Sequence, residues 1–554
     1  MKNTLLALVL ISVLFFWGCQ PHSHKTIIHN VNGYTLNESG ELIQFTALVF
    51  QDGKVLATGR EELLEEFPRG VHIDYEGKTM IPGIIDAHAH VMGLGESLLR
   101  VNLMGIETLD ETLEEIKRFA DENESLAWIT GRGWNQVLWP ENEFPTAADI
   151  DRVVSDRPVY LRRVDGHAAW VNSLALEKAG IDHTTEDPQG GAIIKDEDGN
   201  PSGILIDRAM YLVDALIPEP DDNERRLALD LALESIAAHG ITSIHDAGVS
   251  TDAFRIFRDY ANRNWLTTRI YGMIGGSDET FDELAKDGPF FSDDDMLTLR
   301  SVKLYSDGAL GSRGAALKEE YSDDPGNYGL LFDTEESFYQ QITKVADAGF
   351  QVGIHAIGDK ANHVILNAFE RRKADVGDEG LRHRIEHAQI VSVDEIPRFA
   401  ELGIIASMQP VHASSDLNMA EDRVGPNRIM GGYAWRTFLD AGVVIASGSD
   451  FPVEFVNPFY GFHAGINRTD LSGNPEGGWY PELAMSRTET FRSFTLDAAY
   501  AAHQDDVLGT LEPGKWADFV IIDRDFFTIP NEEIININVL ETWVAGQRVF
   551  LQRD

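Results

Sequence analysis

Residues 81–90 read IPGIIDAHAH, a short apolar run that ends in two histidines, His88 and His90. An apolar run of this length, followed by polar residues, is typical of a buried β-strand. Side chains of a strand alternate between its two faces, so histidines two residues apart point to the same side and could bind one metal ion. A pair of this kind can also arise by chance on a surface, and its meaning depends on the rest of the chain.

Further apolar runs follow this one, and amphipathic helical patterns such as 224–239 and 335–348 lie between them. Strands that alternate with helices in this way predict an α/β protein with a closed, TIM-like (β/α)8 barrel. The active site of such a barrel is built at the carboxyl ends of its strands, where polar residues become catalytic candidates. The predicted strands are 83–87, 242–245, 268–273, 302–305, 351–355, 383–387, 404–408 and 443–447.

Polar residues able to complete a metal site stand where four of these strands give way to loops. Independent chance placement of one lysine, two histidines and one aspartate at such points is improbable. Imidazole combined with carboxylate suits zinc or a similar divalent ion. The sequence therefore predicts a metal centre at the mouth of the barrel, formed by His88, His90, Lys303, His355, His387 and Asp450.

Both ends of the chain contain short strand-like runs separated by turn residues, and neither end is long enough to bury a core alone. Pairing 26–81 with 505–554 into one small β-sandwich solves this problem for both. The first two barrel strands are much farther apart than an ordinary connection allows, which predicts an inserted subdomain over 107–220. The barrel itself then takes 82–106 and 221–504.

The composition is that of a globular protein, with 43% hydrophobic and 25% charged residues. Acidic residues outnumber basic ones by 90 to 46, which gives a formal net charge of -44. Such a surface repels phosphate backbones, so nucleic acid is not expected as a partner. The scattered acidic residues are most simply interpreted as a solubilising surface.

The N-terminus has the features of an export signal. Lys2 precedes an apolar stretch over 5–17 that is too short to span a bilayer but fits the core of a secretion signal. Cys19, the single cysteine, resembles the lipidated cysteine of a bacterial lipobox, although Phe16 departs from the usual aliphatic residue. We expect residues 1–19 to be a signal peptide with lipobox, and the mature protein to be exported and lipid-anchored to the bacterial cell envelope. A plain signal peptide with an incidental cysteine is the alternative.

Several motifs together resemble the amidohydrolase superfamily, and specifically its amidohydrolase-3 branch, which includes N-substituted formamide deformylases. The resemblance covers nearly the whole mature chain. Its motifs are Pro82-Gly83 with the two histidines, Gly131-Arg132-Gly133-Trp134, Asp165-Gly166-His167 with Trp170 and Asn172, Asp307-Gly308-Ala309-Leu310-Gly311, His355-Ala356-Ile357-Gly358-Asp359, Glu386-His387-Ala388 and Ser449-Asp450-Phe451-Pro452.

The resemblance implies one or two divalent ions, with Zn²⁺ as the expected metal. His88 and His90 would hold the more buried ion, and His355 and His387 the more exposed one. Lys303 matches a bridging lysine that carbon dioxide converts to a carbamate, because an ammonium group has no lone pair for a metal. A merely structural Lys303 would leave a mononuclear site.

The expected activity is a metal-dependent amidohydrolase that cleaves a carbon–nitrogen bond other than a peptide bond in a small molecule, such as an N-acyl or N-formyl amide. Metal-activated hydroxide would attack the carbonyl, and Asp450 would act as general base and then acid. A hydrolytic deaminase on the same scaffold is one alternative. A catalytically inactive secreted binding protein is another.

Substrate contacts are expected from polar residues in the inserted subdomain and in loops that follow strands. For Arg313 and His412, ordinary loop contacts are the favoured alternative, whereas His167 could equally stabilise the inserted subdomain. Glu386 could orient a ligand histidine, but strand alternation relative to His387 favours the side of the outer helices. The oligomeric state stays open, with a homodimer among the options. The candidates are His167, Asp307, Arg313, Gln409 and His412.

Overall fold

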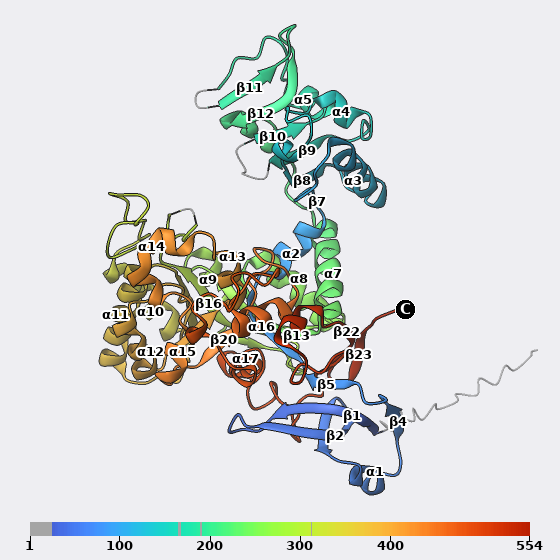
Figure 1. The fold of residues 1–554 in the computed structure, drawn as a ribbon, viewed down its shortest axis with the longest axis vertical. Helices are drawn as coiled ribbons and strands as arrows, with labels where there is room; N and C mark the ends of the chain where they lie inside the picture. Colours follow the sequence, from blue (N-terminus) through green and yellow to red (C-terminus); the bar gives the residue numbers. More distant parts are fainter. Residues whose placement is uncertain (1–24, 164–167, 189–190, 312, 554) are drawn as a thin grey trace, which may run out of the picture.

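The computed structural model describes residues 25–163, 168–188, 191–311 and 313–553. The chain forms three parts: a barrel in the middle, a β-domain on one side of it and an inserted subdomain on the other (Figure 1). The predicted signal peptide with Cys19, and the substrate candidate His167, lie outside the described residues. Within the described ranges, no helix is long and apolar enough to cross a membrane.

The barrel sheet contains eight parallel strands, as the sequence predicts. Their order is β20-β19-β18-β17-β16-β14-β13-β6, and the short β15 (Phe290–Phe291) pairs antiparallel with β16 at the side. Almost every strand residue is buried, which is expected for a parallel sheet covered by helices. The strands are β6 (Ile84–Ala89), β13 (Ile241–Val249), β14 (Arg269–Gly275), β16 (Leu297–Tyr305), β17 (Gln351–Ala356), β18 (Arg384–His387), β19 (Ile405–Met408) and β20 (Ile445–Ser447).

The first and last strands meet at the mouth of the barrel, where the loop after β20 contacts the end of β6. The backbone N–H of Asp450 donates to the backbone oxygen of His88 at 2.7 Å. The carboxylate of Asp86 accepts from the hydroxyl of Ser449 at 2.6 Å. Glycine is required at position 448, because a Cβ there would lie 2.4 Å from the backbone nitrogen of His88. This close approach brings Asp450 beside the two histidines of residues 81–90.

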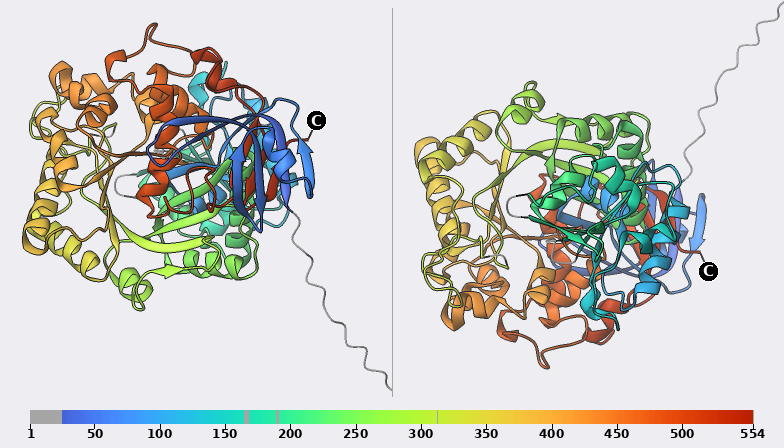
Figure 2. Two further views of the ribbon diagram at one scale, coloured as in Figure 1. Left: turned by 90° about the horizontal axis from the view of Figure 1, so that it is seen from below. Right: turned by 90° about the horizontal axis from the view of Figure 1, so that it is seen from above.

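Helices surround the barrel sheet, as both views along its axis show (Figure 2). Their starts are encoded locally: at α7, Asp221 caps the helix and Glu224 completes a capping box. The predicted helices 224–239 and 335–348 correspond to α7 and α10. The helices are α2 (Val91–Leu98), α7 (Asp222–Ala238), α8 (Thr251–Asn262), α9 (Glu279–Leu284), α10 (Glu335–Asp347), α11 (Asp359–Val376), α12 (Ile396–Leu402), α13 (Pro410–Ser415), α14 (Ala420–Arg428), α15 (Trp435–Asp440), α16 (Pro458–Asn467), α17 (Arg487–Ser493) and α18 (Leu496–Ala501).

The β-domain joins the two chain ends in one sheet, in which β5 pairs with β21. Phe50 and Phe519 stand three strands apart along this sheet, yet their ring centroids are 6.1 Å apart. The sheet therefore folds over, and its two halves enclose a common core. Its elements are β1 (Thr26–Leu36), β2 (Leu42–Gln51), β3 (Lys54–Gly59), α1 (Glu62–Glu66), β4 (Val71–Asp74), β5 (Thr79–Pro82), β21 (Phe519–Ile522), β22 (Val539–Val544) and β23 (Gln547–Leu551).

The inserted subdomain follows α2 and returns to the barrel at α7, with its own six-stranded sheet. Its core contains Trp134, Trp139 and Trp170, whose rings contact one another. The sheet already includes β7, so the subdomain begins at Val101 and the predicted start at 107 was too late. Its elements are β7 (Val101–Asn102), α3 (Leu109–Glu122), β8 (Ile129–Trp134), α4 (Ala147–Asp151), β9 (Val159–Arg163), β10 (Ala168–Val171), α5 (Ser173–Ala179), β11 (Gly191–Lys195), β12 (Pro201–Asp207) and α6 (Tyr211–Asp214).

Candidate metal centre

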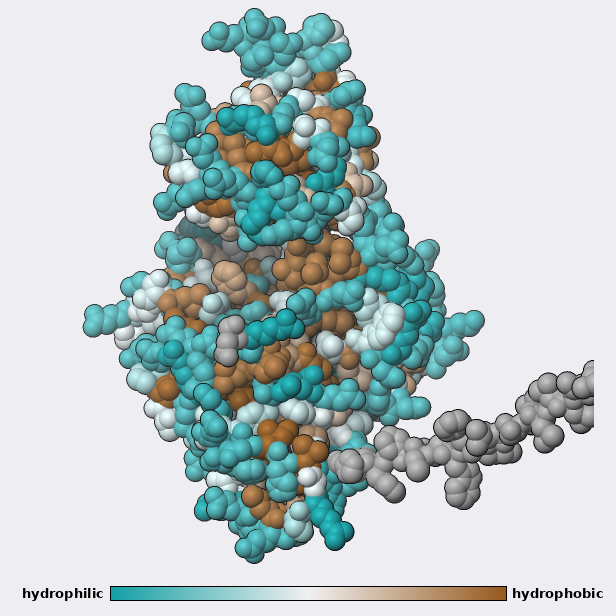
Figure 3. Space-filling view, turned by 90° about the vertical axis from the view of Figure 1, so that its right-hand side faces the viewer, coloured by the Kyte–Doolittle hydropathy of each residue, from teal (hydrophilic) through white to brown (hydrophobic). Residues whose placement is uncertain are grey.

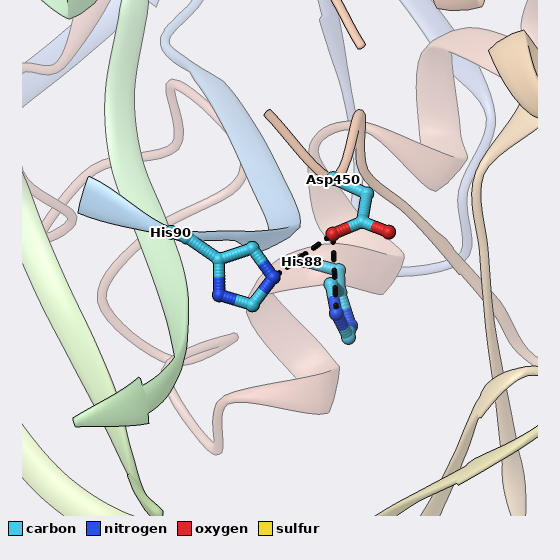
Figure 4. Close-up of side chains that lie close together, drawn as sticks. All are labelled: His88, His90 and Asp450. Atoms are coloured by element: carbon cyan, nitrogen blue, oxygen red, sulfur yellow. Dashed lines mark hydrogen bonds and ion pairs between the residues drawn. The ribbon is translucent and has the colours of Figure 1, made fainter. Parts of the chain in front are cut away.

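Asp450 converges with His88, near the end of β6, and with His90, which follows this strand, at the mouth of the barrel (Figure 4). Oδ1 of Asp450 lies 3.0 Å from Nε2 of His90 and 3.7 Å from Nε2 of His88. Burial alone would raise the pKa of Asp450, but the hydrogen bond with His90 and the nearby imidazoles outweigh burial and hold this pKa below its ordinary value. The carboxylate is therefore ionised at neutral pH.

His355 and His387 complete the cluster from the next side of the barrel. The ring centroids of His387 and His355 are 4.6 Å apart, and those of His387 and His88 are 4.9 Å apart. His387 has a φ of 74°, in the left-handed region, as does Asp450 with 66°. Non-glycine residues rarely adopt this conformation, and it often marks functional sites. Here it turns both side chains toward the centre of the mouth.

Three of the histidines share one hydrogen-bonding pattern. Nδ1 of each ring lies near an oxygen atom that accepts a hydrogen bond, so Nδ1 carries a proton and Nε2 is the atom available to a metal. In His90, Nε2 also lies 3.0 Å from Oδ1 of Asp450. Burial lowers the pKa of His90, but the hydrogen bond and charge of Asp450 outweigh burial and raise it, so a bound ion would take the place of the proton on Nε2. A neutral imidazole held in this way is the form that binds a metal. The acceptors are Glu386 Oε2 for His88 at 2.5 Å, the backbone oxygen of Ala247 for His90 at 2.7 Å, and Gln409 Oε1 for His387 at 2.7 Å.

The donor set fits a divalent ion. One ligand atom each from His88, His90 and Asp450 lies within 4.8 Å of the others, and the same holds for His387, His412 and Asp450. Nε2 of His355 is buried without a hydrogen-bond partner, and burial followed by the charge of Lys303 lowers the pKa of this histidine to about 3. Imidazoles around one ionised carboxylate form a set that zinc accepts.

Lys303 reaches the same point from β16. Its Nζ lies 2.9 Å from Nε2 of His88, and the residue is fully buried. Burial lowers the pKa of Lys303 to about 8. A substantial fraction of the amine is therefore neutral near physiological pH, which is the form that can react with carbon dioxide.

Glu386 faces the interior of the barrel, and the expectation that it points to the outer helices was wrong. Arg384 and Glu386 are alternate residues of β18 and share its inner face, where Nε of Arg384 donates to Oε1 of Glu386 at 2.6 Å. The alternation then fails at His387, because its positive φ turns the next side chain inward as well. Burial would raise the pKa of Glu386, but Arg384 and Lys303 outweigh burial and hold it low. Glu386 is thus an ionised partner of His88.

The predicted substrate residues occupy different positions. Gln409 orients His387, and the His412 ring stacks on His387 with centroids 5.9 Å apart. Nε2 of His412 is buried without a hydrogen-bond partner, 3.7 Å from Oδ2 of Asp450. His412 therefore belongs to the centre itself.

Asp307 and Arg313 have protein partners in the structure. The Asp307 carboxylate accepts three backbone N–H groups, from Ala316, Ile357 and Gly358. These bonds join the loops after β16 and β17, and a substrate contact of this carboxylate stays a prediction. The Arg313 guanidinium pairs with Asp323 at 2.9 Å, in the loop after β16.

Comparison with known proteins agrees with this geometry. Residues 72–550 match the amidohydrolase family, in its third branch. The chain belongs to the amidohydrolase family. This amidohydrolase is 34% identical to the protein LONG AFTER FAR-RED 3 of Arabidopsis thaliana, over 94% of the chain and 91% of that protein. It is 27% identical to the N-substituted formamide deformylase of Arthrobacter pascens, over 94% and 97% of the two chains.

A solved structure shares the fold of the amidohydrolase. It is an uncharacterised metal-dependent hydrolase from Pyrococcus horikoshii, with a TM-score of 0.75 and 28% identity, covering 92% of this chain and 99% of that one. The α/β barrel with its β-domain is therefore the fold of a metal-dependent hydrolase family, and the protein is a hydrolase with side chains that could hold a metal ion.

Proposed function

We propose that this amidohydrolase cleaves a non-peptide amide bond of a small molecule with the help of one or two Zn²⁺ ions. The observation that carries the proposal is the arrangement of the imidazoles of His88, His90 and His387, which lie around the ionised carboxylate of Asp450 with each Nδ1 held by an oxygen atom. A divalent ion bound there would lower the pKa of water toward about 7 and polarise the substrate carbonyl.

Asp450 is the proposed general base and acid. Its carboxylate is ionised and lies among the imidazoles, so it can accept a proton from the attacking water. The same group then returns the proton to the departing nitrogen, because an amide anion is a poor leaving group. His412, whose buried Nε2 has no hydrogen-bond partner, lies 3.7 Å from this carboxylate and is proposed to contact a substrate oxygen.

Lys303 is proposed to carry a carbamate. The neutral amine would attack the carbon of carbon dioxide and release one N–H proton, and the carbamate, with one negative charge shared by its two oxygens, would supply anionic ligand atoms to the centre. The lowered pKa and the 2.9 Å approach of Nζ to Nε2 of His88 support this assignment. We predict about two zinc ions per chain with bicarbonate present and about one in a Lys303→Met variant, measured by elemental analysis. Equal zinc content in the two proteins would assign Lys303 a purely structural role.

The resemblance to a formamide deformylase favours an N-substituted amide over an amidine, which is the substrate of a deaminase. The test is a panel of N-formyl, N-acyl, ureido and cyclic amides, together with aminated heterocycles, given to the purified zinc-loaded protein. We expect turnover of at least one amide class. Release of ammonia from the heterocycles alone would favour the deaminase, and bound zinc without any turnover would favour a binding protein.

A further inference from the structure

A cleft of about 720 Å³ opens where the inserted subdomain meets the barrel, beside α2 and α7. The side of the molecule in Figure 3 is hollowed between these two parts. One wall is the outer face of β8 and β9, with Thr130, Arg132, Tyr160 and Arg162, whereas Trp134 and Leu161 pack into the subdomain core. We call this space the junction cleft.

The junction cleft differs in charge from the rest of the chain. The chain as a whole has 90 acidic and 46 basic residues. The described lining of the cleft has five basic residues, all of them arginine, against four carboxylates. Arginine presents a planar fork of donors that matches carboxylate and phosphate, whereas lysine offers a single compact charge. The arginines are Arg100, Arg132, Arg162, Arg163 and Arg225, and the carboxylates are Glu96, Asp214, Glu219 and Glu224.

Two of these arginines stand directly opposite each other on neighbouring strands. Arg132 of β8 is the register partner of Arg162 of β9. Like charges opposite each other in a sheet destabilise it. Arg162 is neutralised in part by Asp214, at 3.1 Å, but the guanidinium of Arg132 has no hydrogen bond or ion pair with any residue that the structure describes. A cross-strand pair with an uncompensated positive charge is stabilised when an anion binds to both.

The cleft adjoins a hollow that reaches the metal centre. This hollow, of about 350 Å³, contains His90 and shares Glu96 and Arg225 with the junction cleft. Arg225 stands at the connection, and its nearest carboxylates are at 3.9 and 4.0 Å, which is too long for strong ion pairs. A ligand can therefore extend from the metal centre toward the arginine pair.

We propose that the junction cleft binds the carboxylate or phosphate group of a small molecule, held by the forks of Arg132 and Arg162. The anion is either one end of the amide substrate, whose other end lies at the metal centre, or a separate small anion. The first source rests on the proposed function, whereas the anion site itself does not.

The site is tested by titration calorimetry of the zinc-loaded protein with inorganic phosphate and with succinate, at low ionic strength. Loss of one charge-assisted contact should weaken anion binding on the order of 10- to 100-fold. In Arg132→Met and in Arg162→Met, one binding site per chain should therefore become too weak to detect by calorimetry. Arg118→Met is the matched control, since this arginine pairs with Glu115 and Glu122 on the exposed face of α3 in the same subdomain. Unchanged stoichiometry and affinity in Arg132→Met would overturn the proposal.

The source of the anion is tested with 6-formamidohexanoate and its methyl ester. If the anion belongs to the substrate, Arg132→Met raises KM for the acid on the order of 10-fold or more and leaves KM for the ester unchanged. If phosphate binding is lost but KM for the acid stays the same, the ligand is a separate anion. Failure to hydrolyse any amide would refute the proposed function and leave the calorimetric result standing. If the Arg132→Met variant binds phosphate and succinate as well as the original protein and the enzyme still hydrolyses an amide, only the anion site in the junction cleft is refuted.

Discussion

His88 and His387 are neighbouring imidazoles of the same centre, but different chemistry fixes their orientation. Glu386, an ionised carboxylate neutralised by Arg384, holds Nδ1 of His88, whereas the neutral amide of Gln409 holds Nδ1 of His387. Both partners orient a ring, but a charged carboxylate increases the basicity of the imidazole more than a neutral amide does. We therefore expect an ion bound on the His88 side to be held more tightly than one bound on the His387 side.

The environment of the two partners strengthens this contrast. Arg384 is fully buried and also donates to Ser407 and to the backbone oxygen of Ala87. Ala87 precedes His88 on β6, so the arginine ties the carboxylate and the histidine-bearing strand together. Gln409 has a weaker second contact, a donation to the backbone oxygen of Ser407 at 3.3 Å. The partner of His88 is therefore the more rigid of the two.

The largest expected effect comes from the group that contacts both sides. Asp450→Asn keeps the size and one oxygen but removes the base, so turnover should fall on the order of 10²- to 10⁴-fold while zinc is retained. Steady-state kinetics and elemental analysis on the same sample measure both quantities. Asp74→Asn, an exposed change in the β-domain, is the control and should leave both unchanged. Loss of zinc from Asp450→Asn would instead make ligation the main duty of this residue.

The carboxylate side should show the larger loss of metal affinity. Glu386→Gln preserves the shape but removes the charge, and zinc affinity measured by chelator competition should fall toward 100-fold, the upper end for such partners. Glu395→Gln is a matched control, because Glu395 makes the same 2.5 Å contact to Nδ1 of His363 on the outside of the barrel. If the two variants bind zinc equally well, the charge of Glu386 does not strengthen His88 as a ligand.

A smaller effect is expected on the amide side. Gln409→Leu removes the acceptor of His387 without removing a charge, and zinc affinity should fall by about 10-fold, the lower end of the same range. The loss should appear as faster zinc release in stopped-flow measurements with a chelator. A loss greater than that of Glu386→Gln would reverse the comparison between the two sides.

Much of this centre could be predicted from the sequence because its residues end apolar strands. The eight strands are present, and the strand-end side chains of His88, His90, Lys303, His355 and Asp450 converge as the barrel requires. Strand alternation could not predict the positive φ of His387. This backbone conformation places two consecutive residues, Glu386 and His387, on the same side of the strand. Alternation does place Arg384 and Glu386 on one face, and this pairing of opposite charges was the available signal for the buried ion pair.

Other features depend on contacts between distant segments. Asp307 looked like a pocket residue because it follows a strand, but its oxygens are satisfied by backbone N–H groups from other loops, which no local pattern reveals. The opposed arginines of the junction cleft depend on the register of β8 and β9. That register is set by packing in the subdomain core and not by either segment alone.

The most direct test of the account is zinc anomalous diffraction from crystals of the zinc-loaded protein. The account predicts an anomalous peak at the barrel mouth, within about 2.0–2.1 Å of Nε2 of His88 and Nε2 of His90. A second peak near His355 and His387 would establish a binuclear centre. Zinc bound elsewhere, with the imidazoles of His88 and His90 free of metal, would contradict the central claim that these strand-end residues form the metal centre.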